Sequence, residues 1–234
     1  MSTTFVAENL KVVQKKIENA CQRAGRNRES VLLICVTKTK PVSMLQDAYD
    51  AGERVFGENR VQEIVDKVPQ LPEDISWHMI GHLQKNKVKY LMDRAVMIHS
   101  VDNEALAKTI SKEAVKAGRV MPVLIEVNVA EEETKFGVSV EETEALIRAV
   151  APLPGICIRG LMTIAPYTED PETNRPYFKR LRELSVDIKN KSIDNVTMDE
   201  LSMGMTGDYE VAIEEGATMI RVGTGIFGER QYPV

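Results

Sequence analysis

Short apolar segments alternate with amphipathic segments along the whole chain, and this alternation restricts the fold more than any other feature. The apolar segments are rich in β-branched residues, and the segments between them have helical spacing and often end at glycine. Strands this apolar cannot expose one face to water, so both faces must be covered, as in a parallel sheet. The eight predicted strands are residues 31–36, 54–56, 77–80, 96–99, 123–129, 156–164, a seventh that ends at 200–202, and 218–222.

Eight strand–helix units predict an α/β protein, a single TIM-like (β/α)8 barrel with an extra N-terminal helix at Phe5–Ala24. A doubly wound open sheet is the second possibility. The 234 residues suit one barrel domain over 1–234, with a core of about 28–230, because no linker divides the chain. The other predicted helices are 41–51, one ending at Lys67, 84–92, 103–117, 140–150, 171–189 and 208–215.

Composition and charge exclude several classes of protein. The net charge of −5 argues against nucleic acid or an anionic membrane as the main partner. No apolar run approaches the ~18 residues of a membrane span, and the first residues do not form a signal peptide. The three cysteines, Cys21, Cys35 and Cys157, are widely spaced and odd in number, which favours free thiols over disulfides or a metal site. We therefore expect a cytoplasmic protein.

Lys38 directly follows the apolar run 31–36, just past the carboxyl end of the first predicted strand. A lysine at the mouth of a barrel can lose its charge by desolvation and act as an amine nucleophile. Position alone does not distinguish this role from that of a solvated lysine at a strand end. The choice depends on two segments near the other end of the chain.

Two glycine-rich polar segments follow the last two predicted strands. They are Ser202–Asp208 and Gly223–Gly225, and a barrel often holds phosphate in these two positions. Glycine allows the backbone to approach an anion closely, and Ser or Thr adds hydroxyl donors. The helix predicted from Asp208 also presents an amino end suited to an anion. A phosphate site is favoured over plain turns.

Arg221 lies inside the eighth predicted strand, two residues before Gly223. Strand alternation places these two residues on one face and Ile220 and Val222 on the other. Arg221 then faces the same cavity as the phosphate loop, unless it forms a salt bridge at the barrel rim. A lysine amine, a phosphate pocket and an inward arginine suit a phosphorylated aldehyde, of which pyridoxal phosphate is the common example.

Six segments spread over nearly the whole chain resemble one family. The chain resembles the pyridoxal-phosphate homeostasis proteins (YggS/PROSC-like), which are similar to the barrel domain of fold-type III enzymes such as alanine racemase. The segments are Val-Thr-Lys-Thr-Lys-Pro at 36–41, Phe-Gly-Glu-Asn at 56–59, His-Met-Ile-Gly-His-Leu-Gln-Lys-Asn-Lys at 78–87, Gly-Leu-Met-Thr-Ile at 160–164, Leu-Ser-Met-Gly-Met at 201–205 and Arg-Val-Gly-Thr-Gly-Ile-Phe-Gly at 221–228.

The resemblance implies a role for particular residues. Lys38 would form a Schiff base with pyridoxal 5′-phosphate, and Arg221 would hydrogen-bond the pyridine nitrogen. Residues assigned to the phosphate are Ser202, Gly223 and Thr224, and residues assigned to the ring pocket are Asn59, His82 and Met203. His82 could instead cap the helix that follows it. His78 and His99 are interpreted as strand or strand-end residues, and three dispersed histidines do not indicate a metal site.

The expected function is binding rather than catalysis. An arginine stays protonated and leaves the pyridine unprotonated, which weakens the ring as an electron sink. Racemases of this fold add a second domain with a catalytic tyrosine, whereas only residues 231–234 follow Arg230 here. We therefore expect a monomer without catalytic residues that buffers pyridoxal phosphate or delivers it to apo-enzymes.

Two other classes of function stay open. One is an enzyme, either a minimal amino-acid racemase or a Schiff-base aldolase without cofactor. The other is a barrel that binds a different phosphorylated metabolite without a covalent bond. A phosphopyridoxyl adduct on Lys38 after borohydride reduction would exclude the aldolase and the non-covalent binder.

Overall fold

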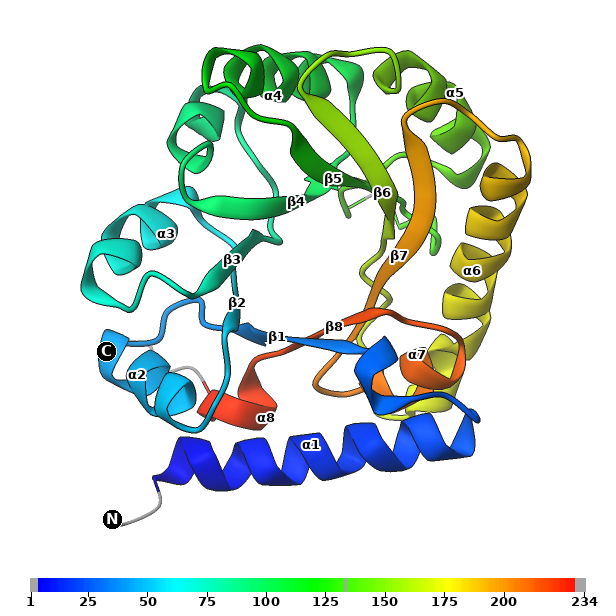
Figure 1. Ribbon diagram of the computed structural model, residues 1–234. Helices are drawn as coiled ribbons and strands as arrows, with labels where there is room; N and C mark the ends of the chain where they lie inside the picture. Colours follow the sequence, from blue (N-terminus) through cyan, green and yellow to red (C-terminus); the bar gives the residue numbers. More distant parts are fainter. Residues whose placement is uncertain (1–3, 133, 230–234) are drawn as a thin grey trace.

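The computed structural model describes residues 4–132 and 134–229, which form a closed parallel barrel (Figure 1). The barrel closes where the first and last strands pair in parallel, from Leu32 opposite Met219 to Cys35 opposite Val222. The predicted (β/α)8 barrel is therefore confirmed, and the open sheet is wrong. The strands are β1 (Leu32–Val36), β2 (Val55–Glu58), β3 (Ser76–Met79), β4 (Ala95–Val101), β5 (Met121–Glu126), β6 (Ile156–Met162), β7 (Val196–Met205) and β8 (Met219–Val222).

Alternation along the strands separates two apolar clusters. The smaller cluster fills the inside of the barrel, with one residue from each of five strands: Ile34, Met97, Leu124, Met162 and Met219. Their sequence neighbours, such as Cys35 and Ile220, belong to the larger cluster between strands and helices. By the same alternation, Arg221 lies on the inner side of β8 with Met219, as the sequence predicted.

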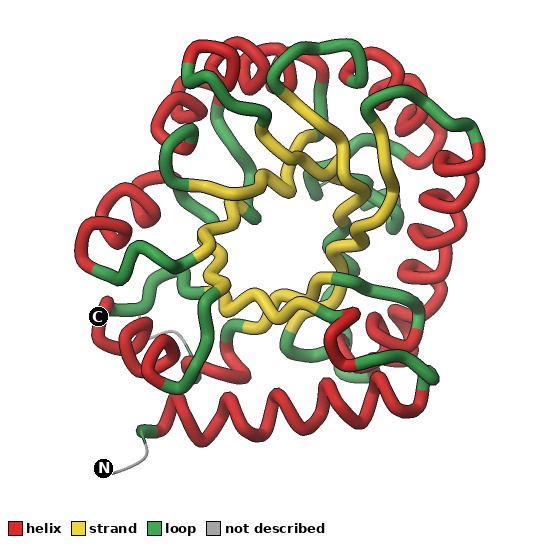
Figure 2. Tube along the Cα trace, viewed as in Figure 1, coloured by secondary structure: helices red, strands yellow, loops and turns green. Residues whose placement is uncertain are grey.

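Helices surround the strands as an outer ring (Figure 2). They are α1 (Phe5–Arg23), α2 (Val42–Asp50), α3 (Val61–Lys67), α4 (Glu104–Lys116), α5 (Val140–Val150), α6 (Arg175–Asn190), α7 (Tyr209–Glu214) and α8 (Thr224–Phe227). The last helix has four residues and cannot cover β8 and β1 alone. The extra helix α1 covers this gap with a buried stripe that includes Leu10, Val13 and Ile17.

The predicted α-helix at 84–92 is wrong, because this segment forms the 3-10 helix η3 (Lys85–Leu91). Its two buried residues, Val88 and Leu91, are three positions apart, which matches the three residues per turn of a 3-10 helix. Three lysines alternate along it, so an α-helix would gain little from favourable charge pairs.

Strand β7 runs to Met205, further than the sequence indicated, so Ser202 and Met203 lie in the strand and not in the loop after it. Gly204 makes this extension compatible with α7. Its φ is +91°, and a Cβ atom there would lie 2.5 Å from the Cβ of Ala212. The glycine read as part of a phosphate loop therefore serves close packing between β7 and α7.

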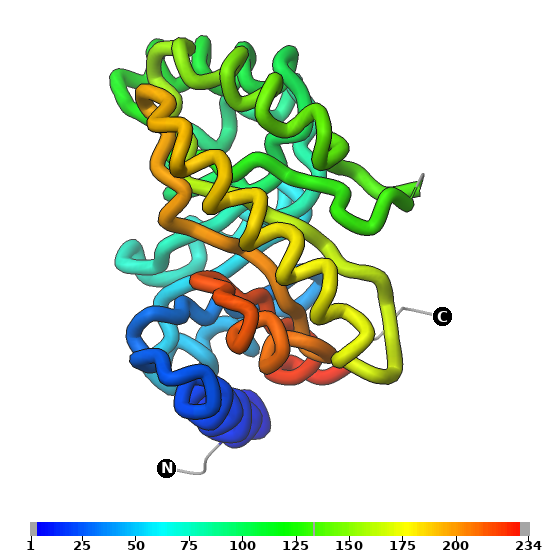
Figure 3. Tube along the Cα trace, turned by 90° about the vertical axis from the view of Figure 1, so that its right-hand side faces the viewer, coloured from blue at the N-terminus to red at the C-terminus, as the bar shows by residue number. Residues whose placement is uncertain are grey.

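The loops after β5 and β6 project from the body of the barrel on one side, where the carboxyl ends of the strands lie (Figure 3). Functional residues of parallel barrels gather at this end. Cys21, Cys35 and Cys157 carry free thiols. None of the described helices has both the length and the apolar surface that a membrane crossing requires.

Candidate functional site

Lys38 lies in a tight turn beyond the carboxyl end of β1. The amide of Lys40 donates to the carbonyl of Thr37 over 3.0 Å, which closes the turn around Lys38. Thr37 is fully buried and Lys38 is half-buried. The last inward-facing apolar residue of β1 in the inner cluster is Ile34, and the turn carries Lys38 beyond the end of this strand.

Lys40 links this turn to the end of α8. Its ammonium group donates to the carbonyls of Phe227, Gly228 and Glu229 at 2.8–2.9 Å. The carbonyl of Phe227 is one of the groups that α8 leaves without an internal partner at its carboxyl end, and Gly228 and Glu229 directly follow this helix. Helix α8 begins at Thr224, so the Lys38 turn and the predicted phosphate loop are attached to the two ends of one short helix.

A chain of buried polar side chains crosses the inside of the barrel below Lys38. Arg221 donates to Ser202 Oγ at 2.7 Å and to the carbonyl of Thr163 at 2.8 Å. Ser202 Oγ lies 2.9 Å from His99 Nδ1, and His99 Nε2 lies 2.9 Å from His78 Nδ1. A guanidinium can only donate, so the direction Arg221 to Ser202 to His99 to His78 uses each group consistently.

Burial keeps both histidines of this chain neutral. It lowers the pKa of His78 to about 4, and burial, with smaller effects of the neighbouring His78 and Arg221, lowers the pKa of His99 well below its usual value. Burial also lowers the pKa of Arg221 to about 10, which leaves the guanidinium charged near neutral pH. A group bonded to Arg221 therefore receives a proton donor that keeps its proton.

Glu126, at the carboxyl end of β5, adds a buried carboxyl group on the inner side of the barrel. It is 4% exposed, and its Oε2 atom has no hydrogen-bond partner among the described residues. Burial and, to a smaller extent, Asp102 raise the pKa of Glu126 to about 7, while Arg221 acts in the opposite sense. The carboxyl group thus changes its charge close to physiological pH.

Replacement of Glu126 by glutamine should flatten one part of the pH–stability curve. The folded state binds the Glu126 proton more tightly than the unfolded chain, so wild-type stability falls as pH rises from the ordinary carboxyl pKa of 4.5 through about 7. We expect the free energy of unfolding of the wild type, relative to that of Glu126→Gln, to fall by about 2–3 kcal/mol across this interval. Urea unfolding of both proteins from about pH 5 to about pH 8 measures it.

The surface variant Glu144→Gln is the control for this experiment. Its bonds to Lys191 and Arg148 lower the pKa of Glu144, so its contribution to stability is lost only as pH falls below the ordinary carboxyl pKa of 4.5, and the stability difference between wild type and Glu144→Gln should stay nearly constant across the measured interval. Parallel curves for wild type and Glu126→Gln would show that Glu126 does not titrate in this interval.

The segment after β8 meets the end of β7 at Thr206. The amides of Gly223 and Gly225 both lie 3.3 Å from Thr206 Oγ1, to which they donate. The exposed hydroxyl of Thr224 lies between them in sequence. Two converging amides and two hydroxyls form a cradle suited to a phosphate group. Sequence reasoning did not assign Thr206, although this residue is in the loop singled out for phosphate.

Asp208 fixes the loop that carries part of this cradle. One carboxylate oxygen accepts from the amide of Met205 at 2.7 Å, and the other accepts from Asn174 Nδ2 at 2.8 Å. The loop between β7 and α7 is therefore closed by a buried carboxylate. Asp208 thus fixes the loop that carries Thr206.

The residues predicted for a ring pocket separate into two groups. Asn59 follows β2 at the mouth, and Gly81 allows close contact, because a Cβ atom on Gly81 would lie 2.7 Å from the Asn59 Cα. His82 stacks on Phe136 with ring centroids 3.9 Å apart, and its Nδ1 lies 3.7 Å from Asp102 Oδ2. Asn59 and His82 line one pocket. The side chain of Met203 instead packs in the apolar cluster outside the strands.

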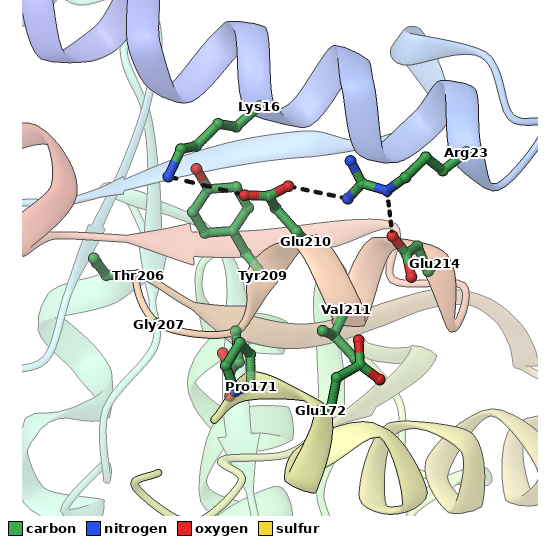
Figure 4. A pocket seen from close by; sticks show the side chains of 11 residues that line it. Lys16, Arg23, Pro171, Glu172, Thr206, Gly207, Tyr209, Glu210, Val211 and Glu214 are labelled. Carbon is green, nitrogen blue, oxygen red and sulfur yellow. Dashed lines mark hydrogen bonds and ion pairs between the residues drawn. The ribbon is translucent and has the colours of Figure 1, made fainter. Parts of the chain in front are cut away.

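A second pocket lies on the flank of the barrel, between α1 and α7 (Figure 4). Arg23 bonds Glu214 at 2.7 Å and Glu210 at 3.0 Å, and Lys16 lies 3.9 Å from Glu210. These charges neutralise one another across the two helices. The pocket includes Thr206 at one edge, but its other polar groups mainly attach α1 to the barrel.

Comparison with known proteins gives the same family throughout. The family model described as alanine racemase, N-terminal domain, matches residues 8–231. A pyridoxal phosphate homeostasis protein of Aquifex aeolicus is 50% identical over 226 residues, which cover 96% of this chain and 98% of that protein. A protein of the same name in Haemophilus influenzae is 38% identical over 230 residues, which cover 97% of both chains.

Solved structures agree with these matches. PipY of Synechococcus elongatus PCC7942 with PLP bound has a TM-score of 0.81 and 34% identity, over 95% of this chain and all of that chain (100%). An alanine racemase of Clostridium difficile has a TM-score of 0.74 at 13% identity, a likeness of fold alone, over 96% of this chain and 58% of the racemase. The chain belongs to the pyridoxal phosphate homeostasis protein family, and its barrel belongs to the family of alanine racemase N-terminal domains.

Proposed function

We propose that this barrel binds pyridoxal 5′-phosphate as a Schiff base on Lys38 and acts in pyridoxal phosphate homeostasis, by buffering or delivery and not by catalysis. The observation that carries the proposal is the pairing of β1 with β8, in which Cys35 is opposite Val222. The strands continue into the Lys38 turn and the Gly223 cradle, and this proximity of the two segments supports an amine and a phosphate site that act on one ligand. A relative named for pyridoxal phosphate homeostasis and a neighbour with PLP bound support it.

The residues present fit this group. The hydroxyls of Thr206 and Thr224 would donate to phosphate, and the amides of Gly223 and Gly225, which donate to Thr206 Oγ1 at 3.3 Å, would turn to the same group. The buried Arg221 would donate to a ring nitrogen. The Lys38 amine adds to the aldehyde carbon, and the carbonyl oxygen leaves as water with both amine protons, without any change of oxidation state. When bound, the cofactor would supply an electron-withdrawing ring.

Arg221 supports binding over catalysis. Its guanidinium remains charged near neutral pH, so it donates to the ring nitrogen and does not give the nitrogen a full proton. The ring is then a poorer electron sink than one that faces a carboxylate. The same single barrel would release its cargo when water hydrolyses the bond to Lys38, and apo-enzymes in a reducing cytoplasm are the proposed recipients.

Borohydride reduction followed by peptide mass mapping tests the proposal. We expect one phosphopyridoxyl adduct, on the peptide that contains Lys38. The loaded protein is also incubated with single amino-acid enantiomers, whose configuration should be retained. An adduct elsewhere, or rapid racemisation that depends on Lys38, would contradict the proposed function.

The cradle hydroxyls give a second expected result. Thr206→Val combined with Thr224→Val should weaken binding of pyridoxal phosphate by about one to two decades and leave binding of unphosphorylated pyridoxal nearly unchanged. Ser202 is not used here, because its hydroxyl is bonded to Arg221. Titration of both aldehydes into each protein measures the difference.

Thr109→Val on α4 is the matched control, since the Thr109 hydroxyl donates within its own helix, to the carbonyl of Ala105. This variant should bind both aldehydes like the wild type. An equal loss for both aldehydes in the cradle variant would mean that the substitutions damage the fold and not a phosphate site.

A further inference from the structure

We propose that an ion network on helix α3 positions the turn that carries Lys38, so that Glu63 and Lys67 are positioning residues for the covalent bond to the cofactor. The inference rests on the proposed function and extends it to residues outside the cavity. It is drawn from the contacts around the turn and from the backbone conformation of Thr39.

The two peptide groups that flank Lys38 are both held by this network. Lys67 Nζ donates to the carbonyl of Thr37 at 2.9 Å, and the amide of Thr39 donates to Glu63 Oε2 at 2.7 Å. Lys67 and Glu63 bond each other at 2.8 Å, one helical turn apart on α3. The backbone on each side of Lys38 is therefore fixed to a single ion pair.

Glu58 extends the network to the end of β2. Its Oε1 atom accepts from Lys67 Nζ at 2.7 Å and from the hydroxyl of Thr37 at 2.5 Å. Glu58 is fully buried and Lys67 is 7% exposed. Removal of a charged group from water costs several kcal/mol, and apolar residues of similar size often stabilise a fold at least as much as a buried ion pair does. A role in positioning the turn gives a reason for burying these charges.

The conformation of Thr39 is an independent sign of constraint. Its φ is +63°, a left-handed conformation that is unfavourable for a β-branched residue. The Thr39 amide is the group that donates to Glu63, so the carboxylate stabilises the turn in this strained form. Strained backbone persists where surrounding contacts enforce it, and it is common next to reactive groups.

A rigid turn strengthens the covalent bond through proximity. The amine of Lys38 and the aldehyde of a phosphate-bound ligand react within one complex, and their effective concentration depends on how tightly the amine is held. Loss of the network should therefore reduce the covalent fraction of the bound ligand and speed its release. Total binding through the phosphate cradle, in the segments after β7 and β8, should change much less.

Glu63→Gln and Lys67→Met test this in the full chain. With pyridoxal phosphate at saturation, we expect the borohydride-trapped fraction of bound ligand to fall and release into an excess of apo-enzyme to accelerate roughly tenfold. In the unloaded protein, the Thr39 amide should exchange with deuterium faster. Wild type is measured first: no trapped adduct on Lys38 there would refute the proposed function itself.

Arg28→Met is the matched control, because Arg28 holds the other end of the same segment by donating to the carbonyl of Val31 at 2.6 Å. The Arg28→Met variant should be less stable than the wild type, but the borohydride-trapped fraction of its bound ligand should be the same. Thr39→Gly removes no buried charge, and glycine adopts the left-handed conformation of this residue without strain, so it should hold the turn with less help from the network. Added to Glu63→Gln, it should therefore restore part of the trapped fraction and slow release again. Wild-type trapped fraction and release rate in Glu63→Gln, or no recovery when Thr39→Gly is added to it, would overturn the inference.

Discussion

Replacement of Lys38 by alanine is expected to abolish covalent capture of pyridoxal phosphate while leaving weaker, reversible binding of the phosphorylated ligand. The amine and the cradle belong to different segments, because Lys38 follows β1 whereas Thr206 and Gly223 follow β7 and β8. Removal of the amine takes away the bond but none of the phosphate donors. Absorbance of the bound ligand, borohydride trapping and a titration together separate the two effects.

Surface lysines also react with aldehydes, so the experiment needs a control at the mouth of the barrel. Lys87 is a suitable control, because it lines the same pocket as Asn59 and His82 but lies in η3. Lys87→Ala should trap as much ligand as wild type. Undiminished trapping in Lys38→Ala would show that another lysine carries the ligand.

Replacement of Arg221 by methionine should cause the largest loss of stability, about 3–5 kcal/mol. Methionine keeps most of the apolar length of the side chain but removes the donors to Ser202 Oγ and the carbonyl of Thr163. It also removes the positive charge that opposes the raised pKa of Glu126. Buried groups that lose a partner in this way retain their full desolvation cost. Urea unfolding of the unloaded protein measures the loss.

Two further variants serve as controls for this result. Arg159→Met removes a half-buried arginine whose guanidinium lies 3.7 Å from Asp199 Oδ2, and should cost less than about 1 kcal/mol. Arg221→Lys keeps the charge but loses the forked geometry, so its stability should lie between wild type and Arg221→Met. If Arg221→Met were as stable as Arg159→Met, the buried polar chain would not contribute to folding.

The fold could be predicted because its signals are local. Each apolar run is followed by a helical pattern, and both faces of a strand such as β1 are covered, which leaves few architectures. The segment at 84–92 was mispredicted because a helical period and a three-residue period differ little over one short run. Strand β7 was predicted too short because its alternation is irregular around its bulge.

The site could be predicted only in part. Lys38 and Arg221 follow from strand ends and alternation, which are properties of single segments. The partners of Ser202 do not, because His99 is 103 positions away and reaches it only when the barrel closes. Glu126 carried no signal beyond its location near a strand end, and Thr206 carried only its place in a loop predicted to hold phosphate. Chemistry assembled from many strands is visible only in three dimensions.

The packing of α1 has a consequence for how the chain folds during synthesis. Asn9 on α1 donates to the carbonyl of Ile226 at 2.9 Å, across a separation of 217 residues. This helix leaves the ribosome long before α7 and α8, which cover its apolar stripe. Contacts of such long range form late and slow the folding of a domain. The growing chain must therefore keep one apolar helix without its final partner for most of translation, and in that interval it is exposed to aggregation.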